Sequence, residues 1–364
     1  MPPVIRLMET GLAPVAAPLL PEDLIALGLD RAGSRKNDSA PRNAAERPTD
    51  CVCLPPVHAC GAATSSMDVA HALAASGDLP PWGSVIAASQ TAGKGQLGRT
   101  WLSPRGNIYA ALRLPAVPPF THTAAAPAVG GLMAQALNAA LGPAGRVRMK
   151  WPNDIVAFVP SPAPDRADAR IEAETPLAEP RPESRQESDQ GPCTGQPCGC
   201  WRKLGGILIE ERRDVVIAGI GLNLISAPPD TVLRPEHALP AGALALIFPC
   251  RNTGDPNRIR PAALWKRLAA SMFLQYNTWG CSEDWLDLAE RHLAFRGRTV
   301  LLVEDEGQAS GLARGVLDGL DASGGLRLSL LSPAGGERAR PQSRVFLSGG
   351  LRLPPTDDAP SPGN

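Results

Sequence analysis

The stretch that decides the fold is Ser89-Gln-Thr-Ala-Gly-Lys-Gly-Gln-Leu-Gly-Arg-Thr-Trp101. It follows residues 85–88, a short apolar run that predicts a strand. Its glycines have the spacing of the dinucleotide-binding fingerprint G-x-G-x-x-G, but that motif needs a helix to begin at the last glycine. Pro104 prevents such a helix, and Arg99 replaces the lysine that a P-loop requires. Neither nucleotide-binding motif is therefore complete.

The sequence around this loop contains no acidic residue. Between Leu79 and Asn153 there is no aspartate or glutamate. The basic residues in this stretch are Lys94, Arg99, Arg105, Arg113, Arg146, Arg148 and Lys150. The backbone N–H groups of a glycine-rich loop and such cations can together bind a polyanion. The alternative is a flexible hairpin loop whose basic residues are incidental.

Overall composition narrows the class of protein. The 364 residues carry 36 basic and 36 acidic side chains, for a net charge of +0. This balance argues against a general nucleic-acid binder, which normally has a basic excess. No run approaches the roughly 18 apolar residues of a membrane span, and the N-terminus lacks the pattern of a signal peptide. We therefore expect a soluble, cytoplasmic protein with no membrane partner.

The sequence predicts four successive regions. Residues 1–60 are expected to be variable and partly disordered, and residues 61–294 to form an α/β domain. Within that domain, residues 158–201 are rich in proline, acids, glutamine and serine, a composition typical of a disordered insertion. Residues 295–354 contain short strands that predict a small β-barrel. Residues 355–364 are expected to be a disordered tail.

The expected elements follow from hydrophobic periodicity. Helices are predicted over 67–75, 124–141 (where Gly130-Gly131 permits close packing), 261–280 and 282–294. Strands are predicted over 85–88, 146–151, 206–210, 215–224, 299–303, 311–317, 326–331 and 345–347. Residues 155–158 and 206–210 flank the insertion, so we expect these two arms to pair as a hairpin with the insertion looping out.

Five motifs, in order along the chain, resemble those of the bacterial biotin–protein ligases (biotin–acetyl-CoA-carboxylase ligases). They are Thr64-Ser-Ser-Met-Asp68, the loop Gly93–Trp101, Lys150-Trp-Pro-Asn-Asp154, Lys203-Leu-Gly-Gly-Ile-Leu-Ile-Glu210 and Gly219-Ile-Gly-Leu-Asn223. The resemblance covers about residues 61–350. It implies an α+β fold: a catalytic domain with a mixed sheet, related to class II aminoacyl-tRNA synthetases, and a C-terminal SH3-like β-barrel.

The resemblance also implies an activity and its partners. Biotin and ATP would be the substrates, with Mg²⁺, and biotinyl-5′-AMP the intermediate. Biotin would then pass to a lysine of a biotin carboxyl carrier protein or domain of the acetyl-CoA carboxylase type. Some members also bind DNA through an N-terminal helix-turn-helix. Residues 1–60 have too many prolines for that module, so we expect no direct DNA binding. A monomer or a homodimer is expected.

Site residues are implied by matching positions. The biotin-binding residues would be Ser65, Ser66, Met67, Gln90, Lys94, Gly95, Gln96 and Lys203. The ATP-binding residues would be Gly93, Arg99, Trp101, Lys150, Asn153, Asp154 and Asn223. The catalytic residues would be Lys203, Lys150 and Arg99, and Asp154 would contact Mg²⁺.

Plainer roles are open for several of these residues. Ser65 and Ser66 can cap the helix over 67–75. Trp151 suits the core, and Asp154 can pair with a neighbouring arginine. The family loop often reads Gly-Arg-Gly-Arg-x-Gly-Arg; Lys94 keeps the first charge without the arginine fork, and Gln96 loses the second.

Two other functions would require residues that this sequence lacks. A lipoate– or octanoate–protein ligase of the same fold would show an Arg-Arg-x-Ser-Gly-Gly-Gly-type loop, which is absent. A biotin-sensing regulator would need a DNA-reading helix. Six of the eight cysteines are Cys51, Cys53, Cys60, Cys193, Cys198 and Cys200. Their spacing departs from the C-x2-C pairs of zinc sites, so we expect incidental thiols, with metal binding as the alternative.

Overall fold

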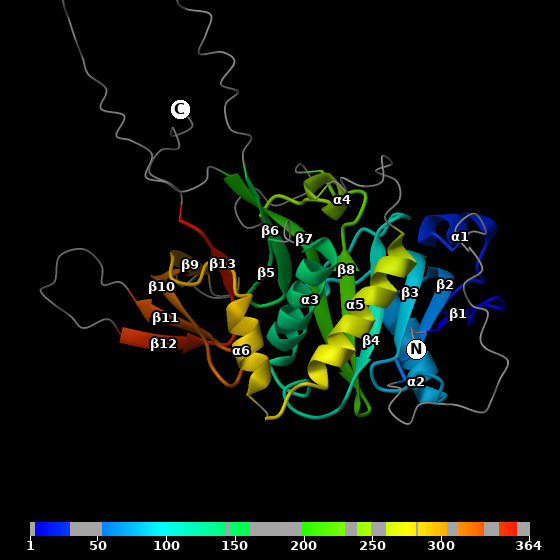
Figure 1. The fold of residues 1–364 in the computed structure, drawn as a ribbon, viewed down its shortest axis with the longest axis horizontal. Coiled ribbons are helices and arrows are strands. Elements are labelled where there is room, and N and C mark those ends of the chain that lie inside the picture. Colours follow the sequence, from blue (N-terminus) through cyan, green and yellow to red (C-terminus); the bar gives the residue numbers. More distant parts are fainter. Residues whose placement is uncertain are drawn as a thin grey trace, which may run out of the picture.

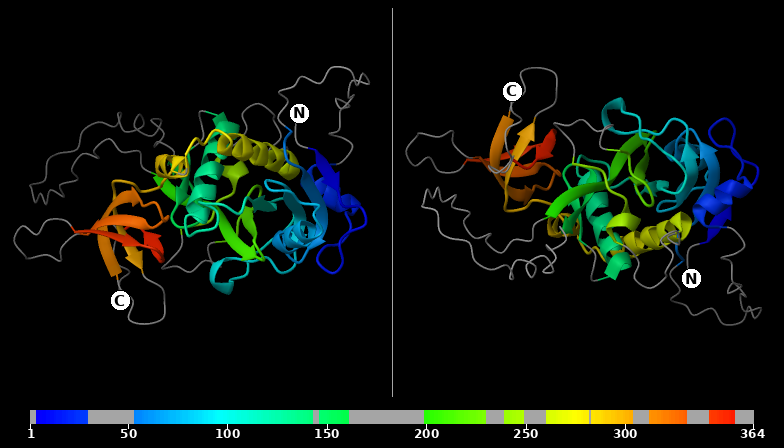
Figure 2. Two further views of the ribbon diagram at one scale, coloured as in Figure 1. Left: turned by 90° about the horizontal axis from the view of Figure 1, so that it is seen from below. Right: turned by 90° about the horizontal axis from the view of Figure 1, so that it is seen from above.

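The computed structural model describes residues 4–29, 53–142, 146–160, 199–229, 239–248, 260–281, 283–303, 312–330 and 342–354. Figure 1 shows a large sheet crossed by two long helices, with a smaller sheet at one end of the molecule. Figure 2 places this smaller sheet opposite the end that carries the N-terminal strand and helix. Among the described residues, no helix is both long and apolar enough to cross a membrane.

The large sheet has eight strands in the order β1-β2-β3-β4-β8-β7-β6-β5. The strands are β1 (Ile5–Leu7), β2 (Val57–Ala63), β3 (Ser84–Gln90), β4 (Ile108–Leu114), β5 (Val147–Lys150), β6 (Asp154–Pro160), β7 (Gly199–Arg212) and β8 (Val215–Leu222). The β1–β2 and β2–β3 pairs are parallel and all the others are antiparallel. The mixed sheet implied by the family resemblance is confirmed.

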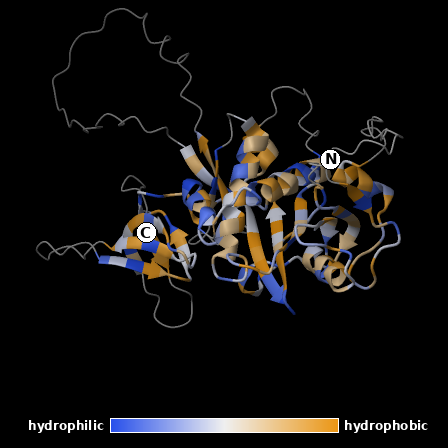
Figure 3. Cartoon of the chain, turned by 60° about the horizontal axis from the view of Figure 1, so that its bottom comes forward, coloured by the Kyte–Doolittle hydropathy of each residue, from blue (hydrophilic) through white to orange (hydrophobic). Residues whose placement is uncertain are grey.

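Helices cover both faces of this sheet. Alternate residues of a strand point to opposite faces, so each strand contributes to two cores. Ile86 and Ala88 belong to the core beneath helices α3 (Ala125–Leu141) and α5 (Pro261–Tyr276). Val85 and Ala87 belong to a second core beneath helix α2 (Ser66–Ala75). The apolar colouring of the central strands in Figure 3 reflects this double burial.

Close helix packing occurs where the sequence predicted it. A Cβ atom at Gly131 would lie 2.9 Å from the Ala289 Cα, in helix α6 (Asp284–Arg291). A side chain at Gly130 would collide with Met149 of β5. The glycine pair therefore lets α3 approach both α6 and the sheet. The described residues also contain two short helices, α1 (Pro21–Leu27) and α4 (Leu244–Ile247).

The smaller sheet is antiparallel, in the order β12-β11-β10-β9-β13. Its strands are β9 (Thr299–Val303), β10 (Leu312–Leu320), β11 (Leu326–Leu330), β12 (Gln342–Phe346) and β13 (Gly350–Arg352). The predicted strands in this region are confirmed, and in the described residues they form an open sheet; an SH3-like barrel stays a prediction. The Trp151 indole N–H donates to the Gly324 carbonyl at 2.9 Å and joins the two sheets. Trp151 is 1% exposed, as expected of a core residue.

The N-terminal region contributes more order than its composition suggested. Strand β1 pairs with β2, and β2 begins at Val57, before the predicted domain start at 61. Leu27 of α1 is buried in the main core, which offsets the entropy of ordering this short segment. The predictions for residues 30–52, most of the insertion (161–198), the tail (355–364), Cys193 and Cys198 lie outside the described residues.

The two arms that flank the insertion do pair. Strand β6 runs antiparallel to β7 from Asp154 opposite Gly206 to Pro160 opposite Gly199. The register differs from the expected one, because residues 199–205 of β7 pair with the bulk of β6. Residues 206–212 of β7 continue along β8 instead. The long β7 strand therefore connects the insertion hairpin to the centre of the sheet.

Candidate active site

Residues 93–101 form a small hairpin, here called the flap. The Trp101 N–H donates to the Gly93 carbonyl at 2.9 Å, and the Gly95 N–H donates to the Arg99 carbonyl at 2.8 Å. Leu97 and Gly98 turn the tip with φ values of 56° and 69°. No α-helix follows, and the chain instead enters β4 at Ile108. This agrees with the sequence argument against both nucleotide-binding motifs.

Trp101, at the end of the flap, packs directly against the backbone of two glycines. A Cβ atom at Gly221 would fall 2.5 Å from the Trp101 ring, and one at Gly206 would fall 3.4 Å from it. Glycine at 221 is therefore required for the indole to lie against strands β7 and β8. The Lys203 Nζ sits 5.8 Å from the centroid of the same ring, within the range of a cation–π contact.

Lys150, Asp154 and Lys203 meet beside this tryptophan. The Lys203 Nζ lies 2.5 Å from Asp154 Oδ1, and the Lys150 Nζ lies 3.3 Å from Asp154 Oδ2. The partners of Asp154 are thus two lysines, where the sequence had suggested an arginine. The cause is strand pairing: Lys150 stands directly opposite Asp154 across β5 and β6, and β7 brings in Lys203.

The electrostatics of this cluster favour a bound anion. Burial by itself would raise the pKa of Asp154. The positive charges of Lys203 and Lys150, and their hydrogen bonds, lower this pKa by more than burial raises it, so the net shift is downward. The carboxylate is therefore ionised at neutral pH. With both lysines charged, the cluster carries one excess positive charge. Because its side chains are 9–28% exposed, this charge is weakly screened by solvent.

Helix α2 begins at the Thr64–Asp68 motif. The Ser65 Oγ accepts a hydrogen bond from the Met67 N–H at 3.3 Å, so Ser65 is the N-cap, the plainer role considered above. The Ser66 N–H donates to Gln90 Oε1 at 2.8 Å, and Gln90 Nε2 donates to the Ser103 hydroxyl at 2.9 Å. The motif and Gln90, both predicted to bind biotin, are therefore in contact.

Of the remaining predicted residues, two are asparagines bonded to strand β7 and two are basic residues on the flap. Asn153 is tied to β7, because its Nδ2 donates to the Ile207 carbonyl at 2.9 Å. Asn223 is 5% exposed, and its backbone N–H donates to the Leu204 carbonyl at 2.7 Å. Arg99 lies exposed on the flap. Lys94 points to acidic residues of α2 and β7.

Comparison with known proteins assigns part of this chain to a family. Residues 61–224 match the model of the biotin/lipoate A/B protein ligase family. These residues are a ligase-family domain. The family resemblance predicted from the motifs is thereby confirmed. Biotin–[acetyl-CoA-carboxylase] ligase of Paracoccus denitrificans is 26% identical over 273 residues, which cover 73% of this chain and 90% of the relative.

Solved structures share the fold of this chain. A biotin protein ligase from Aquifex aeolicus, in complex with biotin and ATP, matches with a TM-score of 0.51 and 18% identity. The match covers 80% of this chain and 94% of that one. An arginine-to-glycine variant of the A. aeolicus ligase, in complex with biotin, gives a TM-score of 0.52 at 18% identity, over 82% and 98% of the two chains.

The structure of the ligase-family domain also reveals residues that sequence reasoning missed. Asn107 is 3% exposed, and its Oδ1 accepts backbone hydrogen bonds from Leu224 and Ile225 at 2.9 and 3.1 Å. It thereby fixes the chain that follows Asn223. Its only signal in the sequence is an asparagine at the start of a strand. Asp68 and Glu210, at the ends of two of the quoted motifs, were also not singled out.

Proposed function

We propose that the chain is an ATP-dependent biotin–protein ligase. The biotin carboxylate would attack the α-phosphorus of ATP, forming biotinyl-5′-AMP and breaking the bond to pyrophosphate. The ε-amine of a lysine on a biotin carboxyl carrier protein or domain would then attack the acyl carbon, and AMP would leave. The relative from P. denitrificans, named for the acetyl-CoA-carboxylase reaction, supports this acceptor class.

The observation that carries the proposal is the Lys150–Asp154–Lys203 cluster beside Trp101. The first half-reaction brings a carboxylate to a triphosphate, so two anions must approach each other. Fixed cations that are present before the substrates arrive lower this barrier. Lys203 lies on the Trp101 side of the cluster and is assigned to the biotin carboxylate and its acyl oxygen. Lys150, with Arg99 from the flap, is assigned to the phosphates.

The other assignments follow the family motifs. On the biotin side we assign Ser65, Ser66, Met67, Gln90, Lys94, Gly95 and Gln96. On the ATP side we assign Gly93, Trp101, Asn153, Asp154 and Asn223. The contact between Gln90 and Ser66 supports the first set, and the contact between Lys203 and Trp101 links the two.

A magnesium ion held by the protein alone does not fit these residues. Both Asp154 oxygens are paired with lysines. Within the described part of the chain, no group of three or more histidine, cysteine, aspartate or glutamate residues could hold a metal. Mg²⁺ is often held by one or two carboxylates together with substrate phosphates. We therefore assign Mg²⁺ to the ATP phosphates, whose charge it would neutralise, with Asp154 as the carboxylate that would contact it.

The domain division belongs to the same proposal. Residues 61–294 would be the catalytic domain, and residues 295–354 an SH3-like domain. Two contacts support a fixed relation between them. Glu290 of α6 accepts a hydrogen bond from the Leu320 N–H at 3.0 Å and lies 3.5 Å from the Arg327 guanidinium.

The test is an acceptor-free assay of the first half-reaction. The purified chain is incubated with ATP, Mg²⁺ and either biotin, lipoate or octanoate, and pyrophosphate release is measured. Burst formation of one equivalent with biotin alone supports the proposal. A burst with lipoate or octanoate and none with biotin overturns it in favour of the other ligases of this family. Adding a carrier domain and detecting biotin on its lysine then tests the second half-reaction.

A further inference from the structure

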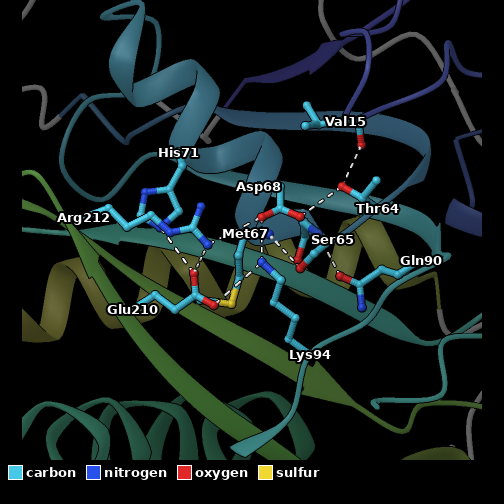
Figure 4. A network of polar contacts seen from close by, with 11 residues as sticks. Val15, Thr64, Ser65, Met67, Asp68, His71, Gln90, Lys94, Glu210 and Arg212 are labelled. Atoms are coloured by element: carbon cyan, nitrogen blue, oxygen red, sulfur yellow. Dashed lines mark hydrogen bonds and ion pairs between the residues drawn. The ribbon is translucent and has the colours of Figure 1, made fainter. Parts of the chain in front are cut away.

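The flap is tied down at two levels. At its base, backbone N–H groups of Thr91 and Ala92 donate to the Ala63 and Thr64 carbonyls, both at 2.8 Å. Further along, the Lys94 Nζ lies 2.6 Å from Asp68 Oδ1 of helix α2 and 3.8 Å from Glu210 Oε1 of strand β7. Figure 4 shows the lysine reaching from the flap toward both acids.

Both acids are held in place by other groups. The Thr64 hydroxyl donates to Asp68 Oδ2 at 3.0 Å, and the Arg212 guanidinium lies 2.6 Å from Glu210 Oε2. Arg212 also lies 3.7 Å from Asp68 Oδ1. Burial raises the pKa of Asp68, but hydrogen bonds from Lys94 and Thr64 lower it more, and the net shift is downward. Lys94 thus meets an ionised, oriented acceptor.

We infer that Asp68 and Glu210 are positioning residues, which act through Lys94 to hold the flap against α2 and β7 before any substrate binds. The inference rests on the proposed function for its meaning, because the flap carries Trp101 onto the lysine cluster. Lys94 stands opposite Thr100 across the hairpin, so tying Lys94 also restrains the strand that ends in Trp101. Asp68 belongs to α2 and Glu210 to β7, so the two acids hold the flap to both of these elements.

Hydrogen exchange without any ligand tests the inference directly. In Asp68→Asn, amides of residues 93–101 should exchange about fivefold faster, the effect of losing one partly exposed ion pair. Glu210→Gln should have a smaller effect, since its distance to Lys94 is longer. Glu211→Gln is the matched control: it is the next residue on β7, exposed, and points to the opposite face. In Glu211→Gln, the flap amides should exchange at the wild-type rate. Asp68→Glu should restore most of the protection.

A double mutant separates positioning from a structural role of Asp68 in helix α2. If Asp68 acts through Lys94, then Asp68→Asn adds no further exchange in a Lys94→Met background, and the α2 amides stay protected. Equal acceleration in both backgrounds, or no acceleration in Asp68→Asn, overturns the inference. The dissociation rate of a non-hydrolysable biotinyl-AMP analogue should rise by a similar factor in Asp68→Asn. If the analogue fails to bind wild type, the proposed function fails, while the exchange data still decide the inference.

Discussion

Asp23 accepts two hydrogen bonds from Arg105, at 2.9 Å from Nε and 2.7 Å from Nη2, although 82 residues separate them. The Asp23 side chain is 1% exposed and also accepts from the Leu20 N–H at 3.1 Å. The pair ties helix α1 to the segment that follows the flap. The N-terminal helix is therefore part of the same folded unit as the large sheet.

The Asp23–Arg105 pair predicts an asymmetry in stability. Arg105→Met leaves a buried carboxylate unpaired and should lower the free energy of unfolding by about 3 kcal/mol. Asp23→Ala leaves a half-exposed arginine that water can solvate, and should cost about 1–2 kcal/mol. Urea unfolding measures both, with Glu22→Ala on the exposed side of α1 as the control. If the two variants lost equal free energy of unfolding, or if Asp23→Ala lost more, the pair would not control the stability of this region.

Lys203 should be the residue most sensitive to loss of charge. Lys203→Met removes a cation from the forming acyl phosphate, so biotinyl-AMP formation should fall about 10²–10³-fold. The melting temperature should change little, because Lys150 still neutralises Asp154. Lys266→Met, on helix α5, is the control for lysine removal. Adenylation near the wild-type rate in the Lys203 variant would refute its assignment.

His292 predicts a loss of stability in mild acid. Burial, and then the charges of Arg148 and Arg291, lower the pKa of His292 from 6.5 to about 4. The unfolded chain takes up this proton as the pH falls through 6.5, whereas the folded protein takes it up only near pH 4. Stability should therefore fall between those values and level off below them.

His292→Gln removes this titration while keeping a polar group near Gln135, whose Oε1 lies 3.4 Å from His292 Nε2. Between pH 7 and pH 5, wild type should lose about 1–2 kcal/mol more than the variant. Urea unfolding at the two pH values measures the difference, with His122→Gln at an exposed turn as the control. Parallel curves for wild type and His292→Gln would rule out this source of the pH dependence.

The insertion should be dispensable for the first half-reaction. Pro160 pairs with Gly199, so an Asn-Gly turn in place of residues 161–198 would close the β6–β7 hairpin. Shortening the loop should stabilise the fold by about 2 kcal/mol and leave adenylation unchanged. Pyrophosphate release and transfer to the carrier are measured separately. Loss of adenylation in a folded deletion variant contradicts this expectation, and loss of transfer alone identifies the insertion as a carrier-docking element.

The local patterns in the sequence were sufficient for most elements. Apolar runs located β3 and β5–β8 of the large sheet and β9–β12 of the smaller one, but β1, β2, β4 and β13 were not predicted. The Gly130-Gly131 pair located the tight helix contact, because it depends on residues close together in the chain. Pro104 correctly excluded a helix after the glycine loop for the same reason. The five motifs indicated the ligase family whose model matches residues 61–224, since their order and spacing can be read along the chain without any tertiary contact.

The pairing of charges was decided only by the tertiary structure. Residues 79–153 contain no acid in sequence, yet folding brings Asp23 to Arg105 and Asp68 to Lys94. A sheet places residues side by side that are far apart along the chain, so the charge of a segment does not set the charge of its surroundings. The sequence by itself determined which cations the site contains. The strand order determined which of them are already neutralised and which, at Lys203 and Lys150, share one carboxylate and leave a net positive charge.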